Sequence, residues 1–231
     1  MRDDDAPRTH RSSETAPTIG ILGAGKVGTV LARLARAAGY RVLISGSGSP
    51  DRIALIVEVL VPGAEPATTA DVIDGADIVI LALPLRSIPN LPAERLREKL
   101  VVDAMNYWEP TDGTLAEFSE DPRGTSEIVR ERLAATRFVK AFSHLGYHDL
   151  DELGRPAGDE DRIALALAGD DAADLATVAT LVDAFGFDPL VVDGLRNGRA
   201  FQAHTPAFGD PMARADLARV IEGARDIEPT V

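Results

Sequence analysis

The chain has 231 residues and a formal net charge of −13 at pH 7, with 45% hydrophobic and 26% charged residues. This length predicts one large domain, or one domain with a short appendage, and the composition is that of a folded globular protein. The negative charge argues against a protein that coats nucleic acid. Because the chain has no cysteine, disulfides, thiolate nucleophiles and cysteine-ligated metals are excluded.

The two ends of the chain and its apolar runs contain no targeting signal. Residues 1–16 mix both charges with Ser, Thr and Pro, which predicts a disordered tail rather than a secretory signal. The longest apolar run, residues 78–83, is much shorter than the roughly 20 residues that cross a bilayer. We therefore expect a cytoplasmic protein whose partners include neither nucleic acid nor a membrane.

From residue 18 onward, short apolar runs alternate with amphipathic stretches. This rhythm predicts an α/β fold of the Rossmann type, a doubly wound and mostly parallel sheet with helices on both faces. The predicted strands are residues 18–22, 41–44, 65–68, 77–83, 101–104, 137–142, 162–168 and 189–193. The predicted helices are residues 27–38, 50–61, 69–75, 93–99, 126–134 and 172–185, with Thr69 as the cap of the third.

The predicted elements form a single nucleotide-binding domain, residues 17–209, which also carries the substrate pocket. A short helix and tail, residues 210–231, follow it. Residues 107–124 are rich in Pro, Gly and Asp and are expected to form a long loop, and long ordered loops in compact domains often carry function.

A glycine-rich segment connects the first predicted strand to the first predicted helix. It reads Gly23, Ala24, Gly25, Lys26, Val27 and Gly28. The first glycine allows a tight turn, the second lets the backbone approach a pyrophosphate, and the third lets the helix pack closely against the strand. The N-terminus of the helix adds N–H donors and positive potential. Since a strand precedes and a helix follows, a dinucleotide site is favoured over a glycine-rich turn without a ligand.

The end of the second strand indicates which dinucleotide is bound. An NAD-binding chain usually has Asp or Glu there, whereas this chain has Ser45. A carboxylate would repel a 2′-phosphate, while Ser45, Ser47 and the amides of Gly46 and Gly48 can donate to it. Arg52 can add positive charge, although a solvated surface arginine is the alternative. The sequence thus favours NADP over NAD.

Two familiar reductase patterns do not fit the sequence. A Tyr-x-x-x-Lys pair is absent, because the positions four after Tyr40, Tyr107 and Tyr147 are not lysine. Imine reductases and hydroxy-acid dehydrogenases build their substrate site from a large helical C-terminal domain, for which we expect no room after residue 193. The substrate is therefore expected at the carboxyl ends of the strands themselves.

Several segments together resemble the NADPH-dependent reductases of the 8-hydroxy-5-deazaflavin coenzyme F420. The segments that carry this resemblance are residues 18–28, 76–84, 101–108, 139–142 and 186–189. The resemblance implies that one domain holds NADP in the glycine loop and lays the deazaflavin over the nicotinamide, so that a hydride passes between two rings. It also implies a homodimer. Such a reaction needs alignment and water exclusion more than side-chain acid–base chemistry.

Carried over by motif position, the resemblance also assigns contacts. Leu83 and Pro84 would wall the nicotinamide, and Asn106 would lie near the second ring system. The pocket would be closed by Ala141, Phe142 and Ser143. Apart from the resemblance, His144 is a solvent-facing or pocket-lining candidate, and residues 200–209, with Phe201, His204 and Phe208, are expected to form a pocket or dimer segment. Core packing is the alternative for the apolar members, because they flank buried strands. Relatives often have Asn where this chain has Ser143, which weakens a detailed transfer of contacts.

The remaining polar residues leave several readings open. Arg86, Lys140, Arg196 and Arg199 are candidates to receive an anionic tail, with surface salt bridges as the alternative. His144 and His148 lie four residues apart, but Leu145 follows where HExxH needs Glu, so we expect no metal.

The alternatives for the function are an NADPH-dependent reductase of a flavin, quinone or ferric chelate, and a non-catalytic NADP(H)-sensing protein.

Overall fold

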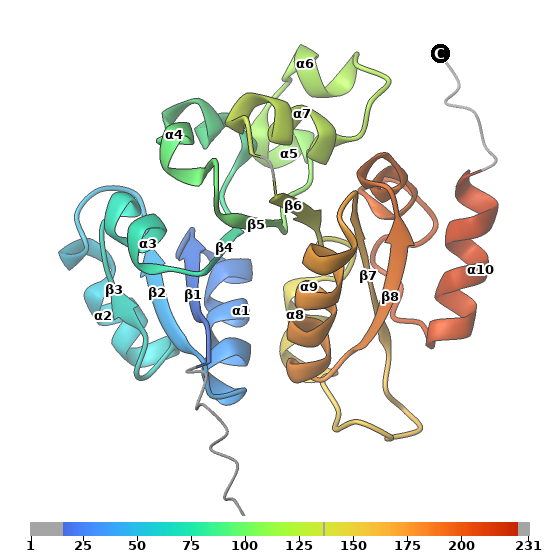
Figure 1. The fold of residues 1–231 in the computed structure, drawn as a ribbon, viewed down its shortest axis with the longest axis horizontal. Helices are drawn as coiled ribbons and strands as arrows, with labels where there is room; N and C mark the ends of the chain where they lie inside the picture. The colour runs from blue at the N-terminus through green and yellow to red at the C-terminus, as the bar shows by residue number, and fades with distance from the viewer. Residues whose placement is uncertain (1–15, 136, 226–231) are drawn as a thin grey trace, which may run out of the picture.

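The computed structural model describes residues 16–135 and 137–225, which form an eight-stranded sheet with helices on both faces (Figure 1). The strand order is β3-β2-β1-β4-β5-β6-β7-β8, and all neighbours run parallel except β6 and β7. The fold is therefore the doubly wound, mostly parallel α/β sheet that the sequence predicts. The order reverses between β1 and β4, which is where open α/β sheets bind ligands at the carboxyl ends of their strands.

The strands follow the predicted positions with small changes at their ends. They are β1 (Thr18–Leu22), β2 (Arg41–Ser45), β3 (Glu65–Pro66), β4 (Ile78–Leu81), β5 (Leu100–Asp103), β6 (Arg137–Lys140), β7 (Ala164–Gly169) and β8 (Asp188–Asp193). Three of them, β4, β5 and β7, are buried along their whole length, and β1 is buried except at Thr18, as expected for strands covered on both faces.

The helices alternate with the strands. They are α1 (Lys26–Ala37), α2 (Asp51–Leu60), α3 (Thr69–Gly75), α4 (Ala93–Leu96), α5 (Glu109–Asp112), α6 (Ala116–Ser119), α7 (Thr125–Leu133), α8 (Tyr147–Glu152), α9 (Ala172–Ala184) and α10 (Arg214–Arg225). Two 3-10 helices, η1 (Leu85–Asn90) and η2 (Leu195–Phe201), follow β4 and β8.

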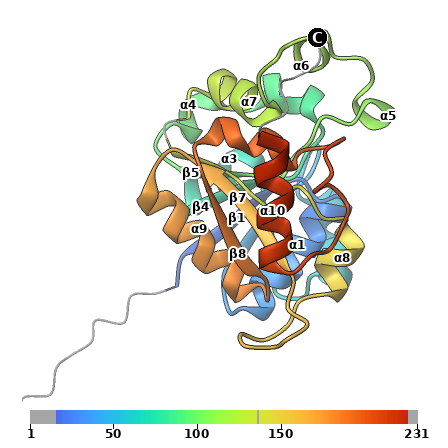
Figure 2. The same cartoon turned by 90° about the vertical axis from the view of Figure 1, so that its right-hand side faces the viewer.

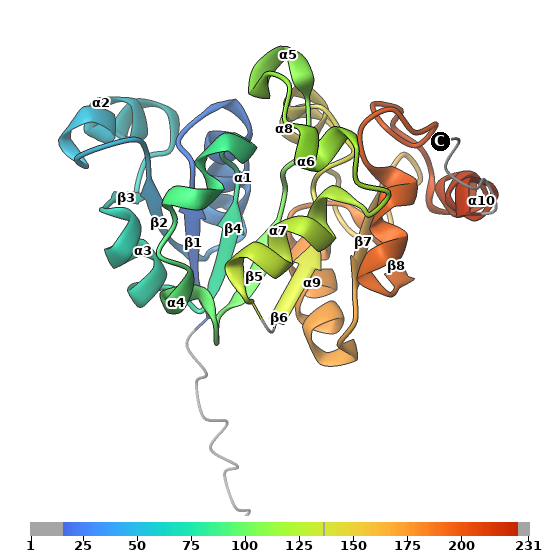
Figure 3. The same cartoon turned by 90° about the horizontal axis from the view of Figure 1, so that it is seen from above.

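Two apolar layers lie on opposite faces of the sheet. One contains buried side chains of α1, α8 and α9, and the other contains those of α3, α4 and α7. Seen from above, α1 and α8 lie on one side of the strands and α4 and α7 on the other (Figure 3). A third cluster joins β7 and β8 to α10, which lies across these strands (Figure 2). The carboxyl edge between the layers is left for ligands.

Some sequence predictions require correction. Thr68, and not Thr69, caps α3, because its Oγ1 accepts the backbone N–H of Asp71 at 3.2 Å. The predicted loop 107–124 contains the short helices α5 and α6. Predicted strands 77–83 and 137–142 end two residues early, since the chain turns out of the sheet at its carboxyl edge. Helix α8 and both 3-10 helices were not predicted.

The predicted tail lies outside the described residues except for Ala16. Within the described part of the chain, no helix is both long and apolar enough to span a membrane.

Candidate functional site

The glycine loop between β1 and α1 is tightly packed at its two ends. Gly23 has φ of +121°, and a Cβ there would lie 2.1 Å from the carbonyl oxygen of Ala82. A Cβ on Gly28 would lie 1.8 Å from the carbonyl oxygen of Gly23. Because neither position can accept a side chain without moving the backbone, the turn and the close strand–helix packing both require glycine.

The centre of the same loop is open. A Cβ on Gly25 would meet no atom within 4 Å, so the backbone here faces free space. Gly25 is also the N-cap of α1, and no side chain caps the first N–H groups of this helix. These donors and the helix dipole are free for an anion, and the loop thus has the shape and charge that a pyrophosphate needs.

The carboxyl end of β2 adjoins this loop. The backbone N–H of Gly23 donates to the carbonyl of Ser45 at 2.9 Å, and Gly46 lies next to Ala24. The side chain of Ser45 is buried, and its Oγ accepts from Thr69 Oγ1 at 3.4 Å. Ser47 and Arg52 are exposed, and the Arg52 guanidinium lies over Gly48.

The groups available to a ribose 2′-phosphate are therefore those of the loop after β2 and the start of α2. Among the described residues, the Arg52 guanidinium makes no ion pair or hydrogen bond, so its charge is not neutralised. No carboxylate stands at the position of Ser45. The local charge is suited to a phosphate more than to a free hydroxyl.

The residues after β4 and β5 lie beside the glycine loop. Leu83 is half-buried and Pro84 is exposed, and the turn that they form approaches Gly23. Asn106 Nδ2 donates to the carbonyl of Ser143, and its Oδ1 accepts the N–H of Ala203 at 3.3 Å. Asn106 thus connects the carboxyl ends of β5 and β6 to the segment after η2.

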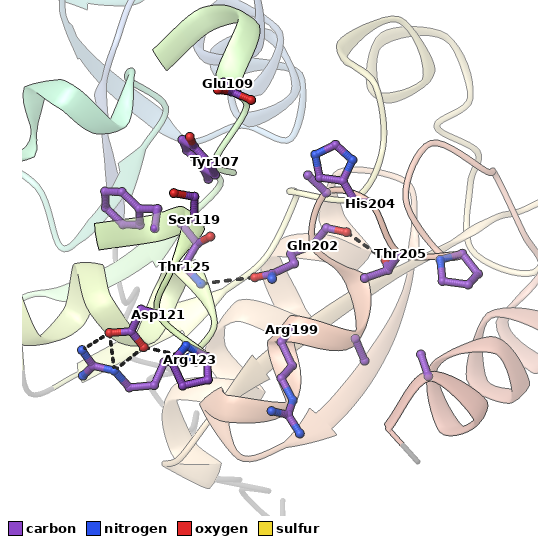
Figure 4. Close-up of a pocket in the computed structure, with 16 residues that line it drawn as sticks. Tyr107, Glu109, Ser119, Asp121, Arg123, Thr125, Arg199, Gln202, His204 and Thr205 are labelled. Atoms are coloured by element: carbon purple, nitrogen blue, oxygen red, sulfur yellow. Dashed lines mark hydrogen bonds and ion pairs between the residues drawn. The ribbon is translucent and has the colours of Figure 1, made fainter. Parts of the chain in front are cut away.

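A cavity of about 680 Å³ opens beside Asn106, between the segment 107–125 and the segment 199–206 (Figure 4). Tyr107 stacks on Phe118 in one wall, with ring centroids 6.0 Å apart. Gln202 in the opposite wall accepts the N–H of Thr125 at 3.2 Å, which joins the two walls. The predicted functional loop is therefore one side of a ligand-sized cavity.

An aromatic group lies at the mouth of this cavity. Trp108 is exposed and stacks on His204, with ring centroids 5.3 Å apart, and on Phe208, with centroids 6.2 Å apart. Of the residues predicted to form the second pocket, Phe208 thus belongs to this aromatic group. Trp108 itself was missed, although its position inside the predicted functional loop was a usable signal.

The other predicted pocket residues lie in the core. Ala141 and Phe142 are almost completely buried, and the Phe142 ring packs on Phe185 with centroids 5.3 Å apart. Phe142 has φ of +59°, because the chain turns sharply where β6 ends. Ser143 is also buried, and it offers its carbonyl to Asn106. These residues back the site and do not line it.

His144 is buried and supports the fold through a hydrogen bond to β7. Its ring is buried and its Nε2 accepts the N–H of Ala166 at 3.0 Å, which places the remaining ring proton on Nδ1. Since β6 ends at Lys140, this imidazole pairs an N–H of β7 that has lost its strand neighbour. Burial lowers the pKa of His144 to about 4, so the ring is neutral near pH 7.

The two histidines of the His144–His148 pair do not share a site. His148 is exposed and packs on Tyr147, with ring centroids 4.1 Å apart. The described residues contain no cluster of three or more His, Cys, Asp or Glu side chains with the geometry of a metal site.

The proposed grouping of cations around an anionic tail is wrong for Lys140. Lys140 is buried, and its Nζ donates to Ser126 Oγ at 3.1 Å and to the carbonyl of Met105 at 3.3 Å. Arg86 donates to the carbonyl of Thr111 at 3.3 Å. Arg199 lines the large cavity and Arg196 lines a neighbouring one of about 510 Å³.

Lys140 belongs to a buried network that sequence reasoning missed. Ser126 Oγ donates to Asp103 Oδ2 at 2.6 Å, and the N–H of Met105 donates to Asp103 Oδ1 at 2.9 Å. Burial raises the pKa of Asp103 and lowers that of Lys140, while the opposite charge of each partner works against both shifts. The network fixes the ends of β5 and β6 and the start of α7 under the cavity.

Comparison with known proteins agrees with this description. Residues 18–107 match the family model described as NADP oxidoreductase, coenzyme F420-dependent. The match covers less than half of the chain and runs from β1 past β5, so it includes the whole glycine loop. This part of the chain is thus similar to the nucleotide-binding segment of NADP-dependent oxidoreductases. A search among curated proteins gave no match.

Solved structures extend the likeness beyond that segment. A hypothetical protein from Sinorhizobium meliloti is 26% identical, with a TM-score of 0.73 over 85% of this chain and 95% of its own. A "putative F420-dependent NADP-reductase" from Arthrobacter sp. FB24 is also 26% identical, with a TM-score of 0.66 over 80% of this chain and 88% of its own.

A more distant structure shares the fold alone. An imine reductase from Myxococcus stipitatus in complex with NADP⁺ is 17% identical, with a TM-score of 0.58 over 90% of this chain. Only 62% of the imine reductase is covered.

Proposed function

We propose that this protein is an NADP-dependent oxidoreductase that transfers a hydride between NADPH and a deazaflavin coenzyme. The observation that carries the proposal is the cavity of about 680 Å³ beside Asn106, which lies between residues 107–125, after β5, and residues 199–206, after β8. A second planar substrate in this cavity would meet the nicotinamide at the carboxyl edge of the sheet. The match of residues 18–107 and the name of the Arthrobacter structure support a deazaflavin as that substrate.

The chain provides three parts of such a site. The amides at the start of α1 hold the pyrophosphate, and the loop after β2 with Arg52 holds the 2′-phosphate. Leu83 and Pro84 provide an apolar face for the nicotinamide. Tyr107 and Phe118, stacked in the cavity wall, provide aromatic surface for a ring system.

When both are bound, NADPH supplies the hydride and the deazaflavin accepts it at a ring carbon, so neither step needs a nucleophile from the protein. The task of the chain is to hold the two reacting carbons about 3–3.5 Å apart and to exclude water. This alignment requires a rigid floor of the site. The floor is held by the buried network of Asp103, Ser126 and Lys140 and by the hydrogen bonds of the Asn106 side chain.

Steady-state assays with a panel of acceptors test the proposal. NADPH is mixed with the protein and with the oxidised deazaflavin, FMN, a quinone or a ferric chelate, and the loss of NADPH is followed. We expect kcat/KM for the deazaflavin to exceed the others by orders of magnitude. A higher value for another acceptor would replace the deazaflavin, and tight NADPH binding without turnover on any acceptor would favour a nucleotide sensor.

A further inference from the structure

His204 lies at the mouth of the cavity in an unusual setting. Its backbone has φ of +68°, a left-handed conformation that few residues other than glycine adopt. The imidazole is exposed, stacks nearly parallel to Trp108 with an interplanar angle of 17°, and lines the cavity (Figure 4). Neither ring nitrogen has a hydrogen-bond partner among the described residues, so both are available to a ligand.

The carboxylates of the cavity are engaged elsewhere. Asp121 accepts from Arg123 through both carboxylate oxygens, which lowers its pKa to about 2. Glu109 accepts from Thr114 Oγ1 at 2.8 Å. The charged and titratable groups that share the cavity with His204 are Tyr107, Glu109, Asp121, Arg123 and Arg199.

The tyrosine and the arginines are not suited to proton transfer near neutral pH. The hydroxyl of Tyr107 donates to the carbonyl of Gly113 and accepts the N–H of Leu115, both at 3.2 Å. Guanidinium groups do not release protons in proteins. Imidazole is the side chain that ordinarily exchanges a proton between about pH 5 and pH 8. His204 is therefore the described cavity residue with both the chemistry and the free nitrogens for this exchange.

Reduction of the acceptor consumes a proton as well as a hydride. A hydride carries two electrons to the ring carbon of the acceptor, and the reduced acceptor also gains one proton on a ring nitrogen. We propose that His204 supplies this proton, an inference that rests on the proposed function. The C4–H bond of NADPH breaks with its electron pair, a C–H bond forms on the acceptor, and the imidazolium N–H passes its proton to the acceptor nitrogen. The imidazole then takes up one proton from the solution, so that the net reaction consumes one NADPH and one proton for each acceptor reduced.

The stack with Trp108 serves this role. A protonated imidazole over an indole face gains a cation–π attraction, which holds the ring at the cavity mouth in its charged form. The left-handed backbone at His204 turns its side chain onto Trp108, which belongs to the opposite wall. The proton donor is thereby placed between the solvent and the ligand.

Tryptophan fluorescence tests the proton exchange without turnover, because Trp108 is the single tryptophan of the chain. A charged imidazole in contact with an indole quenches its emission. We expect the emission of the intact protein to fall as the pH is lowered from about 8 to about 5. This titration should be lost in His204→Asn, which keeps a residue that tolerates the left-handed backbone. It should persist in His148→Asn, whose histidine lines none of the cavities described above. An unchanged titration in His204→Asn overturns the proposal.

The pH profile of turnover tests the catalytic role. In the direction of acceptor reduction, kcat should fall as the pH rises, because the donor must be protonated, and in the reverse direction kcat should fall as the pH drops. In His204→Asn we expect the fall of kcat with pH to vanish in both reaction directions. We also expect kcat near neutral pH to fall about 100-fold, with the KM for NADPH unchanged. An active variant with the wild-type profile refutes the role of His204 and leaves the hydride transfer intact. A wild-type protein inactive on every deazaflavin overturns both proposals.

Discussion

At the scale of single residues, the glycine loop shows what spacing alone can predict. The positions of Gly23, Gly25 and Gly28 were enough to predict a turn, an open backbone and a close packing contact. The structure has these features, with obstructed Cβ positions at the two outer glycines and free space at the central one. The loop could be predicted because each glycine acts through its own backbone and its immediate neighbours.

The two kinds of glycine should respond differently to alanine. In Gly25→Ala the added methyl group meets no protein atom, so the melting temperature should stay unchanged while the Kd for NADPH rises about tenfold or more. In Gly28→Ala the methyl group collides with the Gly23 carbonyl, so both the melting temperature and NADPH binding should fall. Thermal melts measure the melting temperature, and calorimetric titrations measure the Kd for NADPH. Normal NADPH binding by Gly25→Ala would show that no phosphate approaches the backbone of residue 25.

Arg52 tests the choice between the two dinucleotides. Its guanidinium is exposed and unpaired beside Gly48, so its attraction to a 2′-phosphate is partly screened by water. We expect Arg52→Ala to weaken NADPH binding about fivefold, or roughly 1 kcal/mol, and to leave NADH binding unchanged. Arg219→Ala, an exposed change on α10, is the matched control. Equal losses for NADPH and NADH would remove the assignment to NADP.

At the scale of elements, the ends of β5, β6 and α7 meet in a network that the sequence did not reveal. Lys140 was interpreted as a candidate to receive an anionic tail, with a surface salt bridge as the alternative. Its burial depends on Asp103 and Ser126, which lie far from it in the chain and become neighbours only when the sheet closes. Local patterns carry no information on such a contact. The strands were predicted because their own apolar runs define them.

The effects of replacing Asp103 and Lys140 on the free energy of unfolding should depend on each other. Lys140→Met leaves the Asp103 carboxyl buried beside an uncharged neighbour, and we expect a loss of about 3–5 kcal/mol in the free energy of unfolding. Asp103→Asn combined with Lys140→Met removes both charges and should regain most of that loss. Urea unfolding measures both variants. A double variant as unstable as Lys140→Met would show that the two charges are not coupled.

The hydrogen bond from the N–H of Ala166 in β7 to Nε2 of His144, which follows the end of β6, predicts a loss of stability in acid. The pKa of His144 is about 4 in the fold, below its ordinary value near 6.5. Because the unfolded chain binds the proton more readily, stability is complete above pH 6.5 and falls as the pH drops toward 4, by about 3 kcal/mol in all. His144→Gln should flatten this part of the curve of unfolding free energy against pH. A curve equally steep in the variant would assign the acid sensitivity to other groups.

At the scale of the whole molecule, the cavity is built by two segments that the sequence could not bring together. Residues 107–124 were expected to carry function, yet the opposite wall comes from residues 199–206, after the last strand. The antiparallel pairing of β6 and β7 determines how the C-terminal part returns to the site, and no local motif predicts it. The net charge of −13 is likewise compatible with a phosphate site, because the guanidinium of Arg52, which pairs with none of the described residues, lies beside Gly48 in the loop after β2.

Isotope transfer tests the central claim of direct hydride passage most closely. NADPH that carries deuterium at the transferred C4 position is mixed with the protein and oxidised deazaflavin, and the reduced product is analysed by mass spectrometry. The account predicts one deuterium on a ring carbon of the deazaflavin for each NADPH consumed. A reduced deazaflavin without deuterium, or no reduction at all, would contradict it.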